Sequence, residues 1–416
     1  MAVILAYGSP SLGHLFPLAA LLSELVERGH QIHLRTMSSG VEKARAAGIN
    51  AEPVDPRIEA LVAPDWLARN ALDVLKMSID VLCRRAVLEV DDLRDAMQRV
   101  QPDVVIVDAN CWGAMSLADA GATPWLVFSP FTPYLRSPGV PPFGPGLRPR
   151  HGVVGRLRDA AFRPFVTHLF DRRMLPRVNA VRAAVGAPTA RSVDSLMRRA
   201  PLLLAVGGEP FEYPHPGWGD AVHLVGACVF EPGPDSVPEW VASIDRPIVL
   251  VNTSSIKQAD TVLACTAFRA LANEPVHVVA TFPAGVPMGL AIPSNATVRQ
   301  FVPHSVVLDR ACCAITHGGM GTTVKALDRG VPVCVVPFAR DQAEVARRVE
   351  VARCGVRLPA DKLTATTLRD AVRTAMTMAD GARRVAAGFA ATGGVGRGAD
   401  LIEMHLGAAL AKNAGQ

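Results

Sequence analysis

The strongest chemical signal in the sequence is a glycine-rich turn between a short apolar run, residues 314–316, and a stretch with helical spacing. Glycine lets the backbone approach an anion, and the first N–H groups of a helix lack partners and carry the positive end of its dipole. The turn therefore predicts a phosphate site, although the same glycines also suit a plain chain reversal. The residues expected at the anion are His317, Gly318, Gly319, Gly321, Thr322 and Thr323.

An acid and an amide follow the next apolar run. That run ends at residues 335–336, and Asp341 and Gln342 come after it. In an open α/β sheet, ligands bind beyond the carboxyl ends of the strands. A carboxylate and an amide there offer acceptors and donors for neighbouring sugar hydroxyls. Asp341 also suits the N-cap of a helix over residues 343–351, so the pair alone leaves both interpretations open.

A histidine and an aspartate in the first third of the chain have the types needed for a general base. His14 lies in the predicted loop between the first strand and the first helix, where Pro17 suits the helix start, and Asp108 ends the apolar run 104–107. The carboxyl ends of these two runs should lie side by side. A carboxylate bonded to one ring nitrogen fixes the tautomer and stabilises the cation formed when the other nitrogen takes a proton. A lone histidine is usually structural, so the prediction depends on this partner.

Short apolar runs alternate with helical stretches along the whole chain, which predicts an α/β fold with parallel sheets. A first helix is expected to end at Gly29. The proline-rich segment 129–150 is expected to form a loop over a cleft. The expected strands cover residues 3–6, 31–35, 104–107, 125–128, 202–206, 248–251, 276–280, 297–300, 314–316 and 332–336.

The length of 416 residues favours two domains over a single core. Prolines and glycines concentrate in residues 207–240, and we place the join near residues 226–238. The residues on either side repeat the same plan of strands and helices. Two α/β lobes are therefore expected.

Composition indicates a soluble, cytoplasmic protein. Half of the residues are apolar and 19% are charged, without a long apolar run, and the first strand begins without a targeting leader. The eight scattered cysteines fit reduced thiols. A net charge of +5 is too mild for a dedicated nucleic-acid binder. No metal is expected, because the histidines and cysteines lack ligand spacing and no Asp-x-Asp pair occurs.

One segment, residues 148–199, is strongly basic. It carries twelve arginines against three aspartates. Solvated helix faces explain such a bias in most proteins. Weak contact with an anionic membrane surface, or with an acidic acceptor, is the alternative.

Four separated motifs resemble one family in the order in which they occur. They are Gly13-His14-x-x-Pro17, the run 301–304, His317-Gly318-Gly319-x-Gly321-Thr322 and Asp341-Gln342. Together they resemble the GT-B glycosyltransferases of the UGT-like small-molecule family, especially the bacterial natural-product and macrolide branch. The resemblance extends over essentially the whole chain.

The resemblance implies two Rossmann-like domains that face a cleft. It implies an N-terminal acceptor-binding domain over 1–228 and a C-terminal nucleotide-sugar domain over 229–398. A last helix, within 399–416, should cross back to the first domain. No cofactor is implied, because the donor is a co-substrate, a UDP- or dTDP-sugar.

The resemblance also implies a role for each site residue. His14, paired with Asp108, should deprotonate the acceptor hydroxyl, which attacks the anomeric carbon with inversion. The donor's base should stack on Phe301 and bond to the backbone of Val302, with His304 near the base or ribose. The remaining expected donor contacts are Ser254, Ser255, His317, Gly319, Gly321 and Thr322 for the diphosphate, and Asp341 and Gln342 for the sugar.

Lys325 departs from the family pattern. Relatives commonly carry a glutamate there that accepts hydrogen bonds from the ribose, and a cation cannot accept them. Either the ribose is held otherwise or Lys325 reaches the phosphates. The choice among uridine, thymidine and guanosine donors therefore stays open.

The expected function is that of an inverting, metal-independent glycosyltransferase that acts on a hydroxyl of a hydrophobic small molecule, such as a polyketide or macrolide. Either a monomer or a homodimer is compatible with this function. One alternative is a glycolipid-type glycosyltransferase at a membrane surface. Another is a non-catalytic GT-B helper protein, against which the retained pair of His14 and Asp108 argues.

Overall fold

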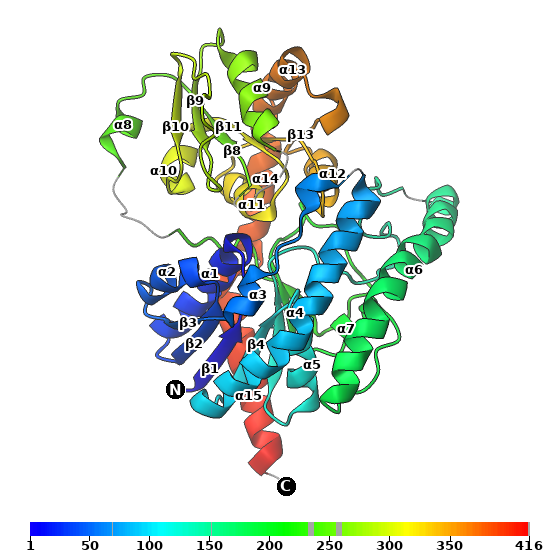
Figure 1. Ribbon diagram of the computed structural model, residues 1–416. Helices are drawn as coiled ribbons and strands as arrows, with labels where there is room; N and C mark the ends of the chain where they lie inside the picture. Colours follow the sequence, from blue (N-terminus) through cyan, green and yellow to red (C-terminus); the bar gives the residue numbers. More distant parts are fainter. Residues whose placement is uncertain (69, 151, 232–236, 255–259, 415–416) are drawn as a thin grey trace.

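The computed structural model describes the chain except residues 69, 151, 232–236, 255–259 and 415–416. It contains two parallel sheets, each flanked by helices, that lie one above the other in Figure 1. The α/β class with two Rossmann-like sheets is therefore confirmed.

The first sheet has seven parallel strands in the order β3-β2-β1-β4-β5-β6-β7. Its central strands are apolar and buried along their whole length, as expected when helices cover both faces of a parallel sheet. The strands are β1 (Val3–Tyr7), β2 (Gln31–Thr36), β3 (Asn50–Pro53), β4 (Val104–Asp108), β5 (Trp125–Ser129), β6 (Leu203–Ala205) and β7 (Val222–Leu224). The helices are α1 (Leu12–Glu27), α2 (Val41–Arg45), α3 (Pro56–Ala60), α4 (Ala71–Val100), α5 (Trp112–Ala120), α6 (Gly152–Ala184) and α7 (Val193–Met197), with short 3-10 turns at Ser38–Gly40 and Asp65–Leu67.

The second sheet has six parallel strands in the order β10-β9-β8-β11-β12-β13. Its strands are β8 (Ile248–Asn252), β9 (His277–Thr281), β10 (Ala296–Arg299), β11 (Ala311–Thr316), β12 (Val333–Val335) and β13 (Gly355–Arg357). The helices are α8 (Glu239–Ala242), α9 (Thr261–Leu271), α10 (His304–Leu308), α11 (Met320–Asp328), α12 (Gln342–Ala352), α13 (Ala365–Met376), α14 (Ala379–Ala391) and α15 (Gly394–Ala414), with a 3-10 turn at Ala360–Lys362.

The last helix, α15, runs down the side of the first sheet and packs against α1 (Figure 1). Arg28, just after α1, donates hydrogen bonds to Asp400 at 2.7 Å and to Glu403 at 2.9 Å. These contacts tie the end of the chain to its beginning. The predicted divisions after residues 228 and 398 stay predictions.

Every strand expected from the sequence is present, but three strands were missed. β3, β7 and β13 have only three or four residues and lie toward the edges of the sheets. Helix α1 ends at Glu27, with Gly29 at a φ of 85°, as a glycine stop requires. The helix starts earlier than expected, at Leu12, so Pro17 lies inside it.

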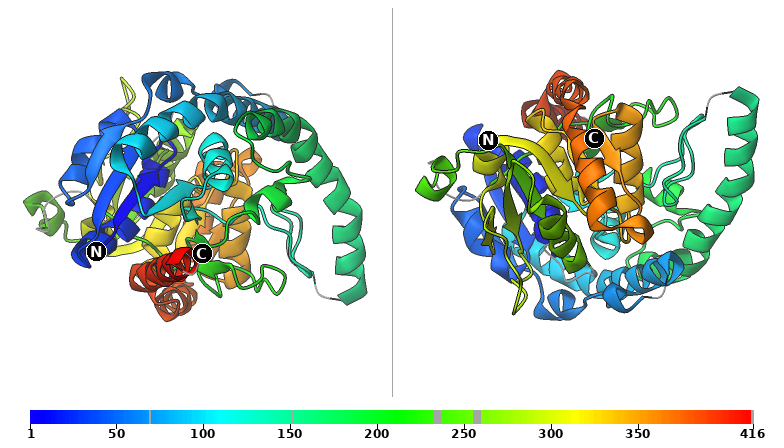
Figure 2. Two further views of the ribbon diagram at one scale, coloured as in Figure 1. Left: turned by 90° about the horizontal axis from the view of Figure 1, so that it is seen from below. Right: turned by 90° about the horizontal axis from the view of Figure 1, so that it is seen from above.

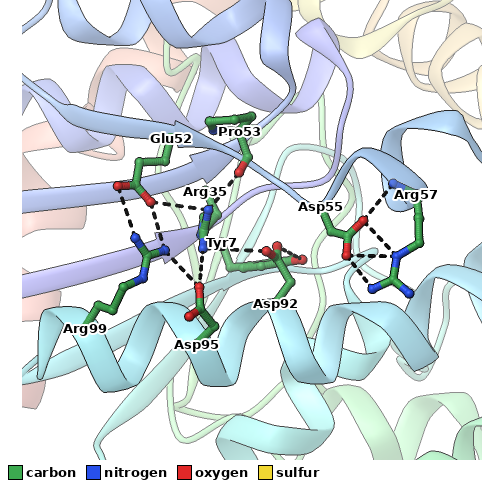
Figure 3. Close-up of polar contacts among 9 residues, drawn as sticks. All are labelled: Tyr7, Arg35, Glu52, Pro53, Asp55, Arg57, Asp92, Asp95 and Arg99. Carbon is green, nitrogen blue, oxygen red and sulfur yellow. Dashed lines mark hydrogen bonds and ion pairs between the residues drawn. The ribbon is translucent and has the colours of Figure 1, made fainter.

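A charged cluster joins β2 and β3 to α4 in the N-terminal lobe (Figure 3). The guanidinium of Arg35 lies 2.9 Å from Asp95 and 3.3 Å from Glu52, and the hydroxyl of Tyr7 donates to Asp92 at 2.8 Å. Arg35 and Asp92 are both nearly buried. The cluster thus holds α4 on the face of the sheet.

Candidate active site

His14 and Asp108 form a hydrogen-bonded pair at the carboxyl edge of the first sheet. The two atoms, Nδ1 of His14 and Oδ2 of Asp108, lie 2.8 Å apart. β1 and β4 are paired in parallel, with Tyr7 opposite Val107, which brings their carboxyl ends together. The sequence placed His14 in a loop, and this is wrong: Ser11 is the N-cap, so His14 lies in the first turn of α1. The pairing with Asp108 is present all the same.

The surroundings of the pair suit a proton acceptor. Asp108 is fully buried, and its second oxygen accepts a hydrogen bond from the backbone N–H of Asn110 at 2.8 Å. The Asp108 carboxylate accepts a hydrogen bond from the Nδ1–H group of His14, which leaves the lone pair of Nε2 free. The His14 side chain is 19% exposed, so a substrate can reach it. Phe131 packs edge-on against the imidazole, with 5.8 Å between ring centroids.

The glycine-rich turn joins β11 to α11 in the second lobe. Gly318 has a φ of 95°, and a Cβ added there would meet Val335 and Gln342 at about 3 Å. A Cβ at Gly319 would lie 2.6 Å from Nε2 of His317. Space beside Gly321 is open. Side chains at the first two positions would therefore disturb the turn, while the open side of the helix start leaves room for a ligand.

The two threonines of α11 face different surroundings. The hydroxyl of Thr322 accepts a hydrogen bond from the side-chain amide of Asn252 at 2.8 Å and is partly exposed. Thr323 is fully buried, and its hydroxyl pairs with that of Thr316 at 3.2 Å. Of the two, only Thr322 is exposed toward solvent at the helix start.

A polar chain that the sequence reasoning missed runs beneath this turn. The hydroxyl of Thr281 donates to Asn252 at 2.8 Å and lies 3.3 Å from Nε2 of His304. Asn252 in turn donates to Thr322. Thr281 is the last residue of β9, and Asn252 is the last residue of β8. A polar residue at the end of a buried strand is the sequence signal that could have identified both. Ser254, predicted instead, is buried and donates its backbone N–H to Asp260 at 2.6 Å, while Ser255 lies outside the described residues.

His317 is buried at the end of β11, with Nδ1 3.6 Å from Asp260. Burial lowers its pKa, although Asp260 opposes the shift. A neutral imidazole at pH 7 can still donate one N–H to a phosphate oxygen.

Lys325 is paired with a carboxylate from the segment between the lobes. Its ammonium lies 2.9 Å from Glu231 and donates to the carbonyl of Phe230 at 3.2 Å. Burial lowers the pKa of Lys325, while Glu231 opposes that shift. Burial and the Lys325 charge together lower the pKa of His304 to about 4, so His304 is neutral at pH 7. Sequence reasoning missed Glu231, since only the fold brings it to Lys325.

Asp341 occupies the N-cap position of α12, but its side chain accepts no capping hydrogen bond. Burial raises the pKa of its carboxyl, and the charges of Arg340, His14 and His317 oppose that shift. The side-chain oxygen of Gln342 accepts hydrogen bonds from the backbone of Phe338 at 2.8 Å and of Ala339 at 2.9 Å.

Residues 301–304, which are predicted to bind the nucleobase, lead into α10, whose first residue is His304. Phe301 is 46% exposed, which is high for a phenylalanine, and Val302 is buried. The exposed ring is free to stack on a planar group. Within the described ranges, we find no group of three or more His, Cys, Asp or Glu side chains placed to hold a metal ion. None of the described helices is long and apolar enough to cross a bilayer.

Comparison with known proteins identifies relatives over most of the chain. Residues 267–393 match the family described as erythromycin biosynthesis protein CIII-like, C-terminal domain. The 4'-demethylrebeccamycin synthase of Lentzea aerocolonigenes is 30% identical over 89% of this chain and 91% of its own length. The demethyllactenocin mycarosyltransferase of Streptomyces fradiae is 26% identical over 97% of this chain and 86% of its own length.

Solved structures with the same fold agree with these relatives. The glycosyltransferase of kitacinnamycin has a TM-score of 0.73 at 23% identity and covers 97% of this chain and 99% of its own. The calicheamicin glycosyltransferase CalG4 has a TM-score of 0.72 at 23% identity and covers 98% of each chain. The fold is thus GT-B, as the sequence resemblance implied. The chain belongs to the GT-B glycosyltransferases of natural-product biosynthesis.

Proposed function

We propose that this protein transfers a sugar from a UDP- or dTDP-sugar to a hydroxyl of a hydrophobic small molecule, with inversion and without a metal ion. The observation that carries the proposal is the 2.8 Å pairing of the buried Asp108 with His14 of α1, a helix that contacts α11 of the other lobe. A histidine held in this way has one free ring nitrogen for the acceptor hydroxyl.

The reaction is a single displacement. Nε2 of His14 removes the proton of the acceptor hydroxyl, and Asp108 stabilises the imidazolium that forms. The acceptor oxygen bonds to the anomeric carbon as the bond to the diphosphate breaks, which inverts the configuration. The helix dipole also disfavours a permanent charge on His14, because the residue lies in the first turn of α1.

The leaving diphosphate binds at the start of α11. Free backbone N–H groups and the dipole of that helix stabilise its negative charge. Because Asn252 donates to the oxygen of Thr322, the Thr322 hydroxyl proton is free for a phosphate oxygen. His317 and the glycines Gly318, Gly319 and Gly321 complete this contact, Thr323 supports it from the core, and Asp341 with Gln342 binds the sugar.

The nucleoside binds over the run 301–304, and Ser254 contributes to the diphosphate site. Phe301 stacks on the base. Lys325 cannot accept hydrogen bonds from the ribose, but Glu231, paired with it, can. We propose that Glu231 binds the ribose hydroxyls. Support for a thymidine nucleotide comes from the glycosyltransferases VinC and SsfS6, which are similar in fold and were solved with thymidine diphosphate.

Aromatic side chains beside His14 favour a hydrophobic acceptor. Tyr134 lies at their centre, with ring centroids 5.2 Å from Phe131, 5.1 Å from Phe143 and 5.4 Å from Phe170. Phe131 in turn contacts His14. Such a wall binds rings and apolar surfaces.

A second candidate acceptor is a lipid at a membrane surface. Exposed apolar residues on the outer side of α6 favour it. Val154, Leu157 and Phe165 are 65 to 70% exposed and recur at helical spacing on one face. Figure 2 shows α6 along the outer rim of the molecule. Its second half is fixed by Met174 and other buried residues. Arginines on the same helix, such as Arg156, Arg172 and Arg173, suit anionic headgroups.

Replacing the proposed base tests the catalytic role. We expect His14→Ala to lower kcat at least 100-fold, because proton removal by a positioned base typically contributes about 10²–10⁴-fold. Affinity for UDP or dTDP should not change. Product formation is measured by liquid chromatography and mass spectrometry with a panel of hydroxylated aromatic acceptors. His33→Ala, on β2, is the control. Full activity of His14→Ala would show that the proposed base is wrong. A wild type without transferase activity would instead favour the helper-protein alternative.

Exchanging the Glu231–Lys325 pair tests the ribose site. Glu231→Gln should weaken UDP binding roughly tenfold, because a charged hydrogen bond is worth about 1.5–3 kcal/mol. Calorimetric titration gives the Kd, and Glu239→Gln, an exposed change nearby, is the control. The double variant Glu231→Lys with Lys325→Glu should recover most of the affinity. Equal affinity of Glu231→Gln and wild type would remove Glu231 from the site.

Vesicle sedimentation tests the membrane candidate. The wild type should sediment with vesicles of phosphatidylcholine and phosphatidylglycerol at low salt and be released at high salt. The double variant Leu157→Asp with Phe165→Asp should stay in the supernatant. Val87→Asp, which changes an exposed apolar residue of α4, should bind like the wild type. Failure of the wild type to sediment at low salt would leave only the small-molecule acceptor.

A further inference from the structure

Helix α12 contributes to both lobes. Its first residues, Asp341 and Gln342, belong to the proposed sugar site. One and two turns later, Glu344 and Arg348 face the N-terminal lobe and are 5% and 2% exposed. Two charged residues buried on one helix face require partners. All of the partners beyond the helix come from the other lobe.

Glu344 binds the proline-rich loop that the sequence placed over the cleft. One of its carboxylate oxygens accepts hydrogen bonds from the backbone N–H groups of Gly144 and Gly146, both at 2.8 Å. Arg347 donates to the carbonyl of Gly146 at 2.8 Å. A Cβ at Gly146 would lie 2.5 Å from the carbonyl oxygen of Ala343, so the loop backbone touches the helix. The loop is therefore fixed to the donor side of the cleft.

Arg348 extends this contact to Glu212 in the loop after β6. Its Nε donates to the two carboxylate oxygens of Glu212 at 2.9 and 3.0 Å, and another nitrogen donates to Glu344 at 2.8 Å. The guanidinium lies over the ring of Tyr213, 4.5 Å from its centroid. Burial opposes the charge of Glu212, but Arg348 and His215 outweigh it and hold the pKa of Glu212 at about 2.

Glu212 connects the arginine to the support of the catalytic histidine. Glu212 also accepts a hydrogen bond from the hydroxyl of Thr132 at 2.6 Å. The preceding residue, Phe131, is the one whose ring edge packs on His14. The series from Arg348 to Glu212, Thr132 and Phe131 ends at the imidazole. The four residues before the imidazole are each at least nine-tenths buried.

We propose that Arg348 is a positioning residue for catalysis: through Glu212 and Thr132 it sets the place of Phe131, and thereby of His14, relative to the sugar bound at the start of α12. This inference rests on the proposed role of His14. A buried ionic network adds little stability compared with apolar residues, but its directional bonds fix one arrangement of the two lobes. The donor and the base are thereby held in register across the cleft.

Thr132 offers the mildest test, because valine has nearly the same shape and lacks only the hydroxyl. We expect Thr132→Val to lower kcat about tenfold, since small displacements of reacting groups cost up to about 10²-fold. The Kd for UDP or dTDP should stay within twofold of wild type. Thr132→Ser, which keeps the hydroxyl, should recover most of the loss. A purely structural role would instead change the melting temperature and leave kcat of the folded enzyme unchanged.

Arg348→Lys is the second variant, in case Thr132→Val fails to fold. Lysine keeps the charge but cannot bind two carboxylates with planar, paired hydrogen bonds. We expect the same lower kcat with an unchanged nucleotide Kd. Wild-type kcat in both variants, together with an inactive His14→Ala, would overturn the inference and leave the proposed function intact. Wild-type activity of His14→Ala would overturn both.

Discussion

The hydrogen bond between His14 and Asp108 is the interaction on which the rest of the site depends. It exists because β1 and β4 are parallel neighbours, so that the first turn of α1 and the end of β4 meet at one edge of the sheet. In the second sheet, the carboxyl ends of parallel strands likewise bring polar residues together. The ends of β8, β9 and β11 carry Asn252, Thr281 and Thr316 beneath the start of α11. In the proposed function, the first edge supplies the general base and the second the anion site.

The two edges work together only if the lobes are held in register. Part of that constraint is apolar, since Phe16 of α1 packs on Phe230 with 6.0 Å between ring centroids. Part is ionic and comes from the buried groups around Arg348. The helix α15 adds a third tie by returning to α1. Contacts of these kinds explain how residues more than 300 positions apart in sequence build one site.

Much of the fold, and the meeting of His14 with Asp108, could be predicted from the sequence, because both follow from local signals for strands and helices. Apolar runs specified the long buried strands, and Gly29 specified the end of α1. The edge strands β3, β7 and β13 escaped because they are only partly buried and form no apolar run, whereas the equally short β6 and β12 are apolar and fully buried. The start of α1 was misjudged because Pro17 looked like a first-turn residue, whereas Ser11 caps the helix. Lys325 was recognised as unusual, but its partner Glu231 could not be found, since only the tertiary fold joins them.

The anomeric configuration of the product tests the central claim most directly. Purified enzyme is given an α-linked UDP- or dTDP-glucose and a hydroxylated aromatic acceptor in the presence of a metal chelator. Proton NMR then reads the coupling constant of the anomeric proton in the glycoside. A single displacement assisted by His14 predicts a β-glycoside formed at the same rate with and without chelator. An α-glycoside, or loss of activity on chelation, would contradict the account.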